Sequence, residues 1–217
     1  MRAPIMAACA LVLGSLYTGA SFADEMYKVT ITNITRGVSF TPILAITHKA
    51  GHPLFNLGDA ASDELAAIAE GGDTAPFSEK LLNSGMAYGA ASSSGLLAPG
   101  ASVSIMVAAD GDFEYLTVAS MLLPTNDGFI AVNGMKLPDG KKTKVMYSPG
   151  YDAGSENNDE LCASIPGPFC KGEAFSAGQG EGYVHIHGGI KGIADLDAAN
   201  YDWRNPVAKI TVMRVKK

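Results

Sequence analysis

Short segments in which apolar and polar residues alternate recur along the chain, separated by turns that are rich in glycine and proline. An alternation with a period of two residues is typical of β-strands that bury one face. The segments that we predict as strands are residues 27–32, 102–107, 115–122, 144–147, 183–187 and 207–213. Their number and their even spread along the chain predict an all-β fold.

Residues 60–70 are the one segment with helical character. Ser62 can cap the start of a helix, and the acidic side chain of Asp63 suits its positive N-terminal end. Gly71 and Gly72 would end it. Many strands, one short helix and turns rich in Gly and Pro predict a β-sandwich with one short helix.

Residues 1–23 carry the pattern of a secretory signal peptide. A short positive start is followed by an apolar run from Ile5 to Tyr17, and small residues precede the acidic Asp24. We expect cleavage after Ala23, which leaves residues 24–217 as one domain that is large enough to bury a core. No other stretch reaches the ~18 uncharged apolar residues that would span a bilayer. The sequence therefore predicts an exported protein, periplasmic or extracellular after processing.

The chain is acidic, with 22 Asp and Glu residues against 16 Lys and Arg residues and a formal net charge of −6. Binding of nucleic acid depends on clustered Lys and Arg side chains. The basic runs at residues 141–144 and 214–217 are more simply interpreted as the solvated ends of strands. Nucleic acid is therefore excluded as a partner.

Two cysteines follow the predicted cleavage site, Cys162 and Cys170, on either side of an Ile-Pro-Gly-Pro turn. In an oxidising compartment such a pair is expected to form a disulfide that fixes a loop. Zinc is the less favoured alternative, because zinc-binding cysteines are usually about two to four residues apart and need two further ligands.

Six blocks of sequence match the pattern of a known family, in the same order along the chain. They are residues 41–48, 58–65, 69–74, 120–129, 151–156 and 203–212. The first has the form Thr-Pro-apolar-Thr-His, and the fifth reads Tyr-Asp-Ala-Gly-Ser-Glu. Together the blocks resemble the spondin N-terminal domain family, and the His-Gly-Gly-Ile-Lys-Gly stretch from His187 resembles its exported bacterial branch.

The resemblance implies a C2-like antiparallel β-sandwich with a calcium site, used in adhesion or extracellular recognition rather than in catalysis. The metal-binding carboxylates of the family fall on Asp127 and Asp152 of this chain. A third family ligand is a glutamate on the strand before the first of these motifs, where this chain has Ala108 and Ala109. The acidic residues nearest to that position are Asp110, Asp112 and Glu114.

The residue types of the two loops also suit calcium, which takes about six to eight oxygen ligands. Residues 125–128, Thr-Asn-Asp-Gly, offer side-chain oxygens beside a glycine that permits a sharp turn. Residues 152–160 are the densest acidic stretch of the chain. The alternative is that both are ordinary surface turns, where Asn, Asp and Gly are common for backbone reasons. The calcium ligands that we predict are Asp127, Asp152 and Glu156.

The histidines suggest a different metal. His185 and His187 alternate with Ile186, so a strand would place both imidazoles on one face, an arrangement that suits copper or zinc. His48 could approach the pair. These residues define an alternative prediction, an envelope protein that binds copper or zinc through His48, His185 and His187.

Motifs typical of enzymes are missing from the sequence. It contains no Gly-x-Ser-x-Gly, no phosphate-binding loop that ends in Gly-Lys-Ser/Thr and no His-Glu-x-x-His. We therefore expect a non-catalytic module for recognition or adhesion. Its expected partner is an extracellular or envelope protein or a glycan.

Overall fold

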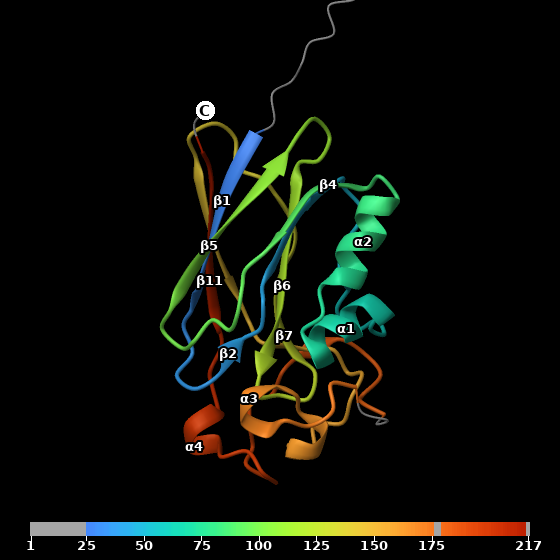
Figure 1. Ribbon diagram of the computed structural model, residues 1–217, viewed down its shortest axis with the longest axis vertical. Coiled ribbons are helices and arrows are strands. Elements are labelled where there is room, and N and C mark those ends of the chain that lie inside the picture. Colours follow the sequence, from blue (N-terminus) through green and yellow to red (C-terminus); the bar gives the residue numbers. More distant parts are fainter. Residues whose placement is uncertain (1–24, 176–178, 216–217) are drawn as a thin grey trace, which may run out of the picture.

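Two antiparallel sheets packed face to face form the body of the molecule, shown in Figure 1 as a computed structural model. The structure describes residues 25–175 and 179–215. The predicted signal peptide, residues 1–23, lies outside these ranges. The predicted fold class, an all-β antiparallel sandwich, is confirmed.

The first sheet has four strands in the order β5-β1-β11-β8. Their bounds are β1 Glu25–Asn33, β5 Ser102–Ala109, β8 Thr143–Ser148 and β11 Ala208–Arg214. In the centre of this sheet β1 pairs with β11, with Val29 opposite Val212. The sandwich therefore depends on a strand that comes late in the sequence, which pairs with the first described strand.

The second sheet has seven strands, in the order β10-β9-β7-β6-β3-β4, with β2 paired to β6. Their bounds are β2 Ser39–Phe40, β3 Leu44–His48, β4 Ala87–Ser92, β6 Tyr115–Leu123, β7 Gly128–Lys136, β9 Tyr151–Asp152 and β10 His185–Ile186. The predicted strand at 183–187 is thus shorter, since only His185 and Ile186 pair with β9.

The strands β3 and β7 were not among the predicted strands. Every residue of β3 is buried, and so are the first five residues of β7. Both lie inside a sheet that is covered on its two faces, by the other sheet and by helices (Figure 1). A strand buried on both faces is apolar without alternation, so the period-two pattern misses it.

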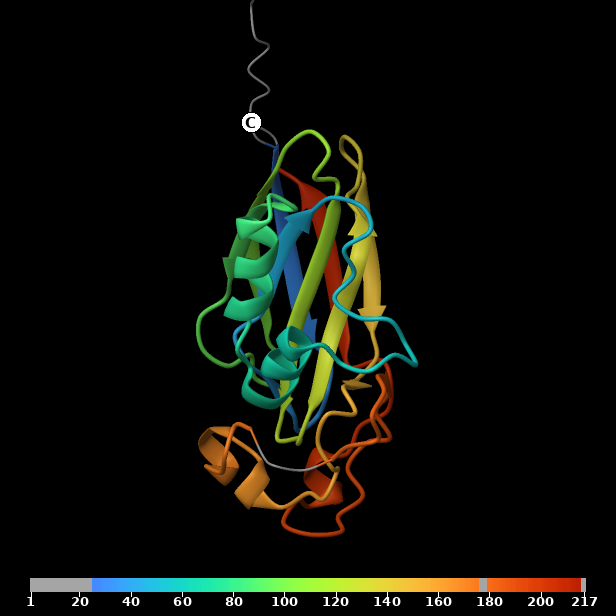
Figure 2. The ribbon, with the colours of Figure 1, turned by 90° about the vertical axis from the view of Figure 1, so that its right-hand side faces the viewer.

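Two helices of nine residues cover the outer face of the second sheet, as Figure 2 shows. The predicted helix is present as α1, Asp63–Gly71, and the Oγ atom of Ser62 accepts a hydrogen bond from the amide of Leu65. Gly72 ends it in the left-handed conformation, with φ 67°. The second helix, α2, Ala75–Asn83, was not predicted, so the expectation of a single short helix is wrong.

The helix α2 escaped prediction because its sequence carries few helix signals. The side chain of its N-cap residue, Thr74, forms no capping hydrogen bond, although Oδ1 of Asp73 accepts a hydrogen bond from the amide of Ala75. Its helical character comes from Phe77 and Leu81, which lie one turn apart and are buried together against the sheet. Two apolar residues are too few to reveal a period of 3.6 residues in the sequence.

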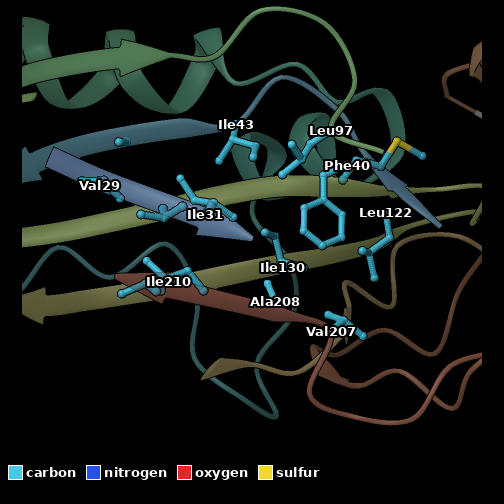
Figure 3. Packing of buried hydrophobic residues seen from close by; sticks show 14 of the residues in the cluster. Val29, Ile31, Phe40, Ile43, Leu97, Leu122, Ile130, Val207, Ala208 and Ile210 are labelled. Atoms are coloured by element: carbon cyan, nitrogen blue, oxygen red, sulfur yellow. The ribbon is translucent and has the colours of Figure 1, made fainter. Parts of the chain in front are cut away.

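The main core fills the space between the sheets. Figure 3 shows Val29 and Ile31 of β1 and Ile210 of β11 facing Leu122 and Ile130 of the second sheet. A second apolar cluster lies between that sheet and the helices α1 and α2. The second sheet is therefore buried on both faces. The loops that begin at the ends of its strands are attached to well-packed strands.

The connections after β9 gather at one end of the sandwich, at the bottom of Figures 1 and 2. They carry three short helical turns, η1 Cys162–Ser164, α3 Gly167–Cys170 and α4 Ala198–Tyr201. The predicted disulfide between Cys162 and Cys170 is present here. Among the described helices, none is both long enough and apolar enough to span a membrane.

Candidate metal site

The two predicted calcium loops meet at the end of the second sheet. Residues 124–127 connect β6 to β7, and β9 pairs with the first residues of β7, so that Gly128 lies opposite Asp152. The amide of Ala153 donates a hydrogen bond to the carbonyl of Asp127, with an N–O distance of 3.2 Å. The antiparallel pairing of β7 and β9 thus places Asp127 and Asp152 next to each other.

The side chain of Asp127 is fully buried, with 0% of the residue exposed. Its Oδ2 atom accepts hydrogen bonds from the amides of Ser155 (2.8 Å) and Glu156 (3.1 Å). Its Oδ1 atom has no hydrogen-bond partner among the described residues. Burial, followed by the charge of Asp152, raises the pKa of Asp127 to about 7. An ionised carboxylate at this position needs a counter-charge that the neighbouring amides supply only in part.

Asp152 is also buried, but both of its oxygens accept hydrogen bonds. Oδ1 accepts from the amide of Gly154 at 2.8 Å, and Oδ2 accepts from the side-chain nitrogen of Asn158 at 2.7 Å. Its carboxylate also faces both histidines of the predicted His-x-His pair. Asp152 therefore lies between the predicted calcium loops and the histidines.

Glu156, the third predicted calcium ligand, is buried, and it has a neighbour that the sequence analysis missed. Glu70, in the last turn of α1, is buried as well, and its carboxyl group lies next to the side chains of Ser155 and Glu156. Burial raises the pKa of Glu70 above its usual range. Two buried carboxyl groups in contact need a shared proton or a cation.

A sequence signal for Glu70 existed. The C-terminal end of a helix carries partial negative charge, so an acidic residue there is unfavourable and a basic one is expected. The helix α1 has no basic residue in its last turn, where Glu70 lies. A buried acid in that position indicates that something outside the helix compensates its charge.

His185 lies on β10 directly opposite Asp152. Its Nδ1 atom is 3.0 Å from the carbonyl oxygen of Ile186, which can only accept, so Nδ1 carries the proton. Its Nε2 atom is 3.6 Å from Oδ1 of Asp152 and 3.8 Å from Oε2 of Glu181. In the described ranges, Asp152, Glu181 and His185 are the group of three whose ligand atoms all lie within 4.8 Å of one another. Glu181 was not predicted as a site residue.

His187 lies on the same side as His185 but presents a different nitrogen. Its Nδ1 atom accepts a hydrogen bond from the amide of Gly189 at 2.9 Å. The proton of the neutral ring must then be on Nε2, which lies 3.9 Å from Oδ2 of Asp152. Burial lowers the pKa of His187, and its ring packs 4.9 Å from that of Trp203. His187 is therefore oriented to direct an N–H group toward Asp152.

His48 is not brought to this site. It lies at the end of β3 opposite Tyr115, where β6 begins, whereas Asp127 follows the other end of β6. Its ring nitrogens contact the carbonyl of Lys49 at 2.8 Å and Oγ1 of Thr117 at 2.9 Å. The nine residues of β6 separate His48 from the metal-site loops by roughly 25–30 Å.

The acids considered for the third calcium ligand also lie at that opposite end. They belong to the connection between β5 and β6 and are Asp110, Asp112 and Glu114. The buried carboxylates that do join Asp127 and Asp152 come from elsewhere, Glu156 from the loop after β9 and Glu70 from α1.

Residues 20–160 match the Spondin_N family model. The matched range contains the four buried carboxylates described above, whereas Glu181 and His185 lie after it. A search of curated proteins finds no match. Because the match spans more than half of the sequence, this chain belongs to the spondin N-terminal domain family, whose domain is of an extracellular type.

Proposed function

We propose that this chain is a non-catalytic module for extracellular recognition or adhesion, and that calcium holds the loops at one end of its sandwich. The observation that carries the calcium proposal is Oδ1 of Asp127, which is fully buried and accepts no hydrogen bond from the described residues. Asp127, Asp152 and Glu156 would be the ligands. Glu70 would either supply a further oxygen ligand or lie near the ion, whose positive charge would then offset the charge of the Glu70 carboxylate.

The donor set fits calcium for two reasons. Its atoms are carboxylate oxygens, the ligands that this hard cation prefers. In the described ranges, neither Asp127 nor Asp152 forms an ion pair with a lysine or an arginine. A divalent cation would therefore offset charges that the protein itself leaves close together, and it would tie the loop after β9 to the turn between β6 and β7.

Thermal unfolding of the chelator-treated protein with and without calcium tests this proposal. We expect calcium to raise the melting temperature, and magnesium to do so much less, because magnesium requires a tighter octahedral site. The variant Asp127→Asn should lose the calcium effect. The matched control is Asp112→Asn, an exposed aspartate at the opposite end, which should retain it. A wild-type protein with no calcium shift would refute the calcium site.

The recognition role is supported by the membership of the family, whose domain is of an extracellular type. The partner that we propose is an extracellular or envelope protein or a glycan. Binding of the purified protein to arrayed glycans and to envelope fractions, with calcium and then with chelator, tests this role. We expect binding that chelator weakens, because the loops would separate without the ion. Turnover of a substrate by the protein would contradict the non-catalytic proposal.

The proposal also includes export directed by residues 1–23. Mass spectrometry of the protein recovered from the envelope and from the medium tests it. The expected N-terminus is Asp24. An intact Met1 in the recovered protein would contradict the predicted cleavage.

A further inference from the structure

The side chain of His185 is arranged as metal-binding histidines are. Its Nδ1–H group is directed at the carbonyl of Ile186, 3.0 Å away. Such a hydrogen bond fixes the tautomer and leaves the lone pair on Nε2. That lone pair faces Asp152 and Glu181, two carboxylates that also carry lone pairs. A neutral histidine and two carboxylates in this arrangement repel one another unless a proton or a metal ion lies between them.

The spacing of these atoms matches a small divalent cation. Zinc binds nitrogen and carboxylate oxygen at about 2.0–2.2 Å, so its tetrahedral ligands are roughly 3.3–3.6 Å apart. The Nε2 atom of His185 is 3.6 Å from Oδ1 of Asp152 and 3.8 Å from Oε2 of Glu181. The oxygens of Asp152 and Glu181 lie within 4.8 Å of each other, and Glu181, with 39% of its side chain exposed, has room to move toward the ion.

A second observation points to a ligand independently of this cluster. The side chain of His187 is 4% exposed, and its Nε2 atom is directed at Asp152 but finds no hydrogen-bond partner in the described part of the chain. The Nε2 atom of His185 has none there either. Buried polar atoms normally have partners, so two such atoms around one carboxylate indicate a group that belongs between them.

A pocket of about 170 Å³ adjoins these residues. Its lining includes Asp152, Glu181, His185 and His187. The pocket would give a metal ion access to solvent and leave room for water molecules on it. Three protein ligands with one position open to water is a common zinc arrangement.

We propose that Asp152, Glu181 and His185 form an open zinc site beside the proposed calcium site, with the carboxylate of Asp152 shared between the two ions. His187 is not a ligand in this proposal, because its Nε2 carries the proton; this N–H group lies 3.9 Å from Oδ2 of Asp152 and would donate to a water molecule bound at the ion. The assignment differs from the predicted histidine site, because it replaces His48 and His187 with two carboxylates. Glu181 and His185 also lie beyond the residues that match the family model, so the site depends on a part of the chain outside that match.

Isothermal titration calorimetry tests the site: the chelator-treated protein is first saturated with calcium and then titrated with zinc chloride. We expect one zinc ion per chain. His185→Gln should weaken zinc binding about tenfold or more, and Glu181→Gln should weaken it too. His52→Gln, which changes a histidine in the loop after β3, is the matched control and should bind zinc as the wild type does. Cobalt(II) in place of zinc should give the visible absorption of a tetrahedral site, which His185→Gln should abolish.

The variants separate this proposal from the calcium proposal. His185 is partly exposed, so His185→Gln should fold and keep its calcium-dependent rise in melting temperature. Asp127→Asn should lose the calcium effect and still bind zinc. Zinc binding that is absent in the wild type, or unchanged in His185→Gln, would overturn the zinc site while leaving the calcium site untouched. A His185 that is protonated and paired with the carboxylates would give that result.

Discussion

The buried carboxyl groups of Glu70 and Glu156 lie close enough to share a proton, although one belongs to α1 and the other to the loop after β9. The pair connects a helix on the outer face of the sheet to the loop that holds Asp127, whose Oδ2 accepts the amide of Glu156. A change of charge in the loop after β9 should therefore also change how firmly α1 is held against the sheet. One variant can test this connection.

We expect Glu70→Gln to raise the melting temperature in chelator and to reduce the further rise that calcium produces. Glutamine keeps a hydrogen-bonding group for Glu156 but removes a buried carboxyl group whose charge a shared proton or a cation would otherwise have to compensate. Differential scanning fluorimetry at pH 7.5 measures both effects. Glu79→Gln, on the exposed face of α2, is the control and should change neither. A melting temperature that falls in chelator would contradict the explanation.

The buried Asp127 should make the metal-free protein less stable as the pH rises. Its pKa is raised from 3.8 to about 7 in the folded protein, so the folded state binds its proton more tightly than the unfolded state does. Below about pH 4 both states are protonated, and this group causes no loss of stability. Between about pH 4 and pH 7 the unfolded state ionises first, and the stability falls by roughly 2–4 kcal/mol in total.

Asp127→Asn isolates this effect, because asparagine is neutral at every pH and its side-chain oxygen can still accept the amides of Ser155 and Glu156. In chelator the variant should equal the wild type near pH 4 and become the more stable protein by pH 8. Denaturant unfolding at several pH values provides the measurement. With calcium at pH 8 the order should reverse. A stability difference that stays constant with pH would exclude an ionising Asp127 as its cause.

The meeting of the two calcium loops could be predicted from sequence because the chemistry is local. Each loop has its own run of oxygen-bearing residues and a glycine, and the family resemblance implies a metal-binding carboxylate in each, Asp127 and Asp152. The disulfide was predictable for the same reason, since Cys162 and Cys170 flank one short turn. Features encoded within about ten residues can be recognised without knowing how the chain packs.

Glu181 could not be found in this way. The acidic residue at the end of α1 marks Glu70 as unusual, but only the packing of the chain shows which loop it joins. Glu70 arrives when α1 packs against β6 and β7. His48 was misplaced for the complementary reason. A strand pattern gives the face of a side chain but not the end of the sheet at which it lies, and the antiparallel pairing of β3 with β6 places His48 beside Tyr115.

The histidine pair shows a further limit. The spacing of His185 and His187 correctly predicted a common side, since both face Asp152. Which nitrogen each ring presents depends on the carbonyl of Ile186 and the amide of Gly189, and those contacts follow from loop geometry. Residue spacing therefore suggested two equivalent rings, whereas in the structure His185 presents an Nε2 lone pair to Asp152 and His187 presents an N–H group.

The disulfide should stabilise the loop region without taking part in metal binding. Replacing both cysteines, Cys162→Ser with Cys170→Ser, is expected to cost roughly 2–3 kcal/mol, because the unfolded chain regains the freedom of a short closed loop. Denaturant unfolding measures the loss, and wild-type protein treated with reductant should reproduce it. The rise in melting temperature with calcium should keep its size in the variant. Loss of that rise would mean that the disulfide, and not the strand pairing, holds the calcium loops together.

The close approach of two loops at Gly154 gives the sharpest test of how the site is built. Gly154 has φ +65°, and a Cβ atom there would lie 2.3 Å from the carbonyl oxygen of Tyr183. Gly182 has a similar φ of +81° but open space around the same position. Gly182→Ala should therefore lower the free energy of unfolding only by the backbone strain, about 1–2 kcal/mol. Gly154→Ala should lower the free energy of unfolding clearly more, because the backbone at Tyr183 must also move.

The displacement at Gly154 would separate the loop after β9 from the segment that leads into β10. The amide of Gly154 also donates a hydrogen bond to Oδ1 of Asp152, so the Asp152 carboxylate and the neighbouring His185 would both shift. We expect Gly154→Ala to weaken calcium and zinc binding together, whereas Gly182→Ala should leave both near the wild-type values. Calorimetry with each metal, on protein shown to be folded by circular dichroism, makes the comparison. Equal metal affinities in the two variants would mean that the site does not depend on the contact between Gly154 and Tyr183.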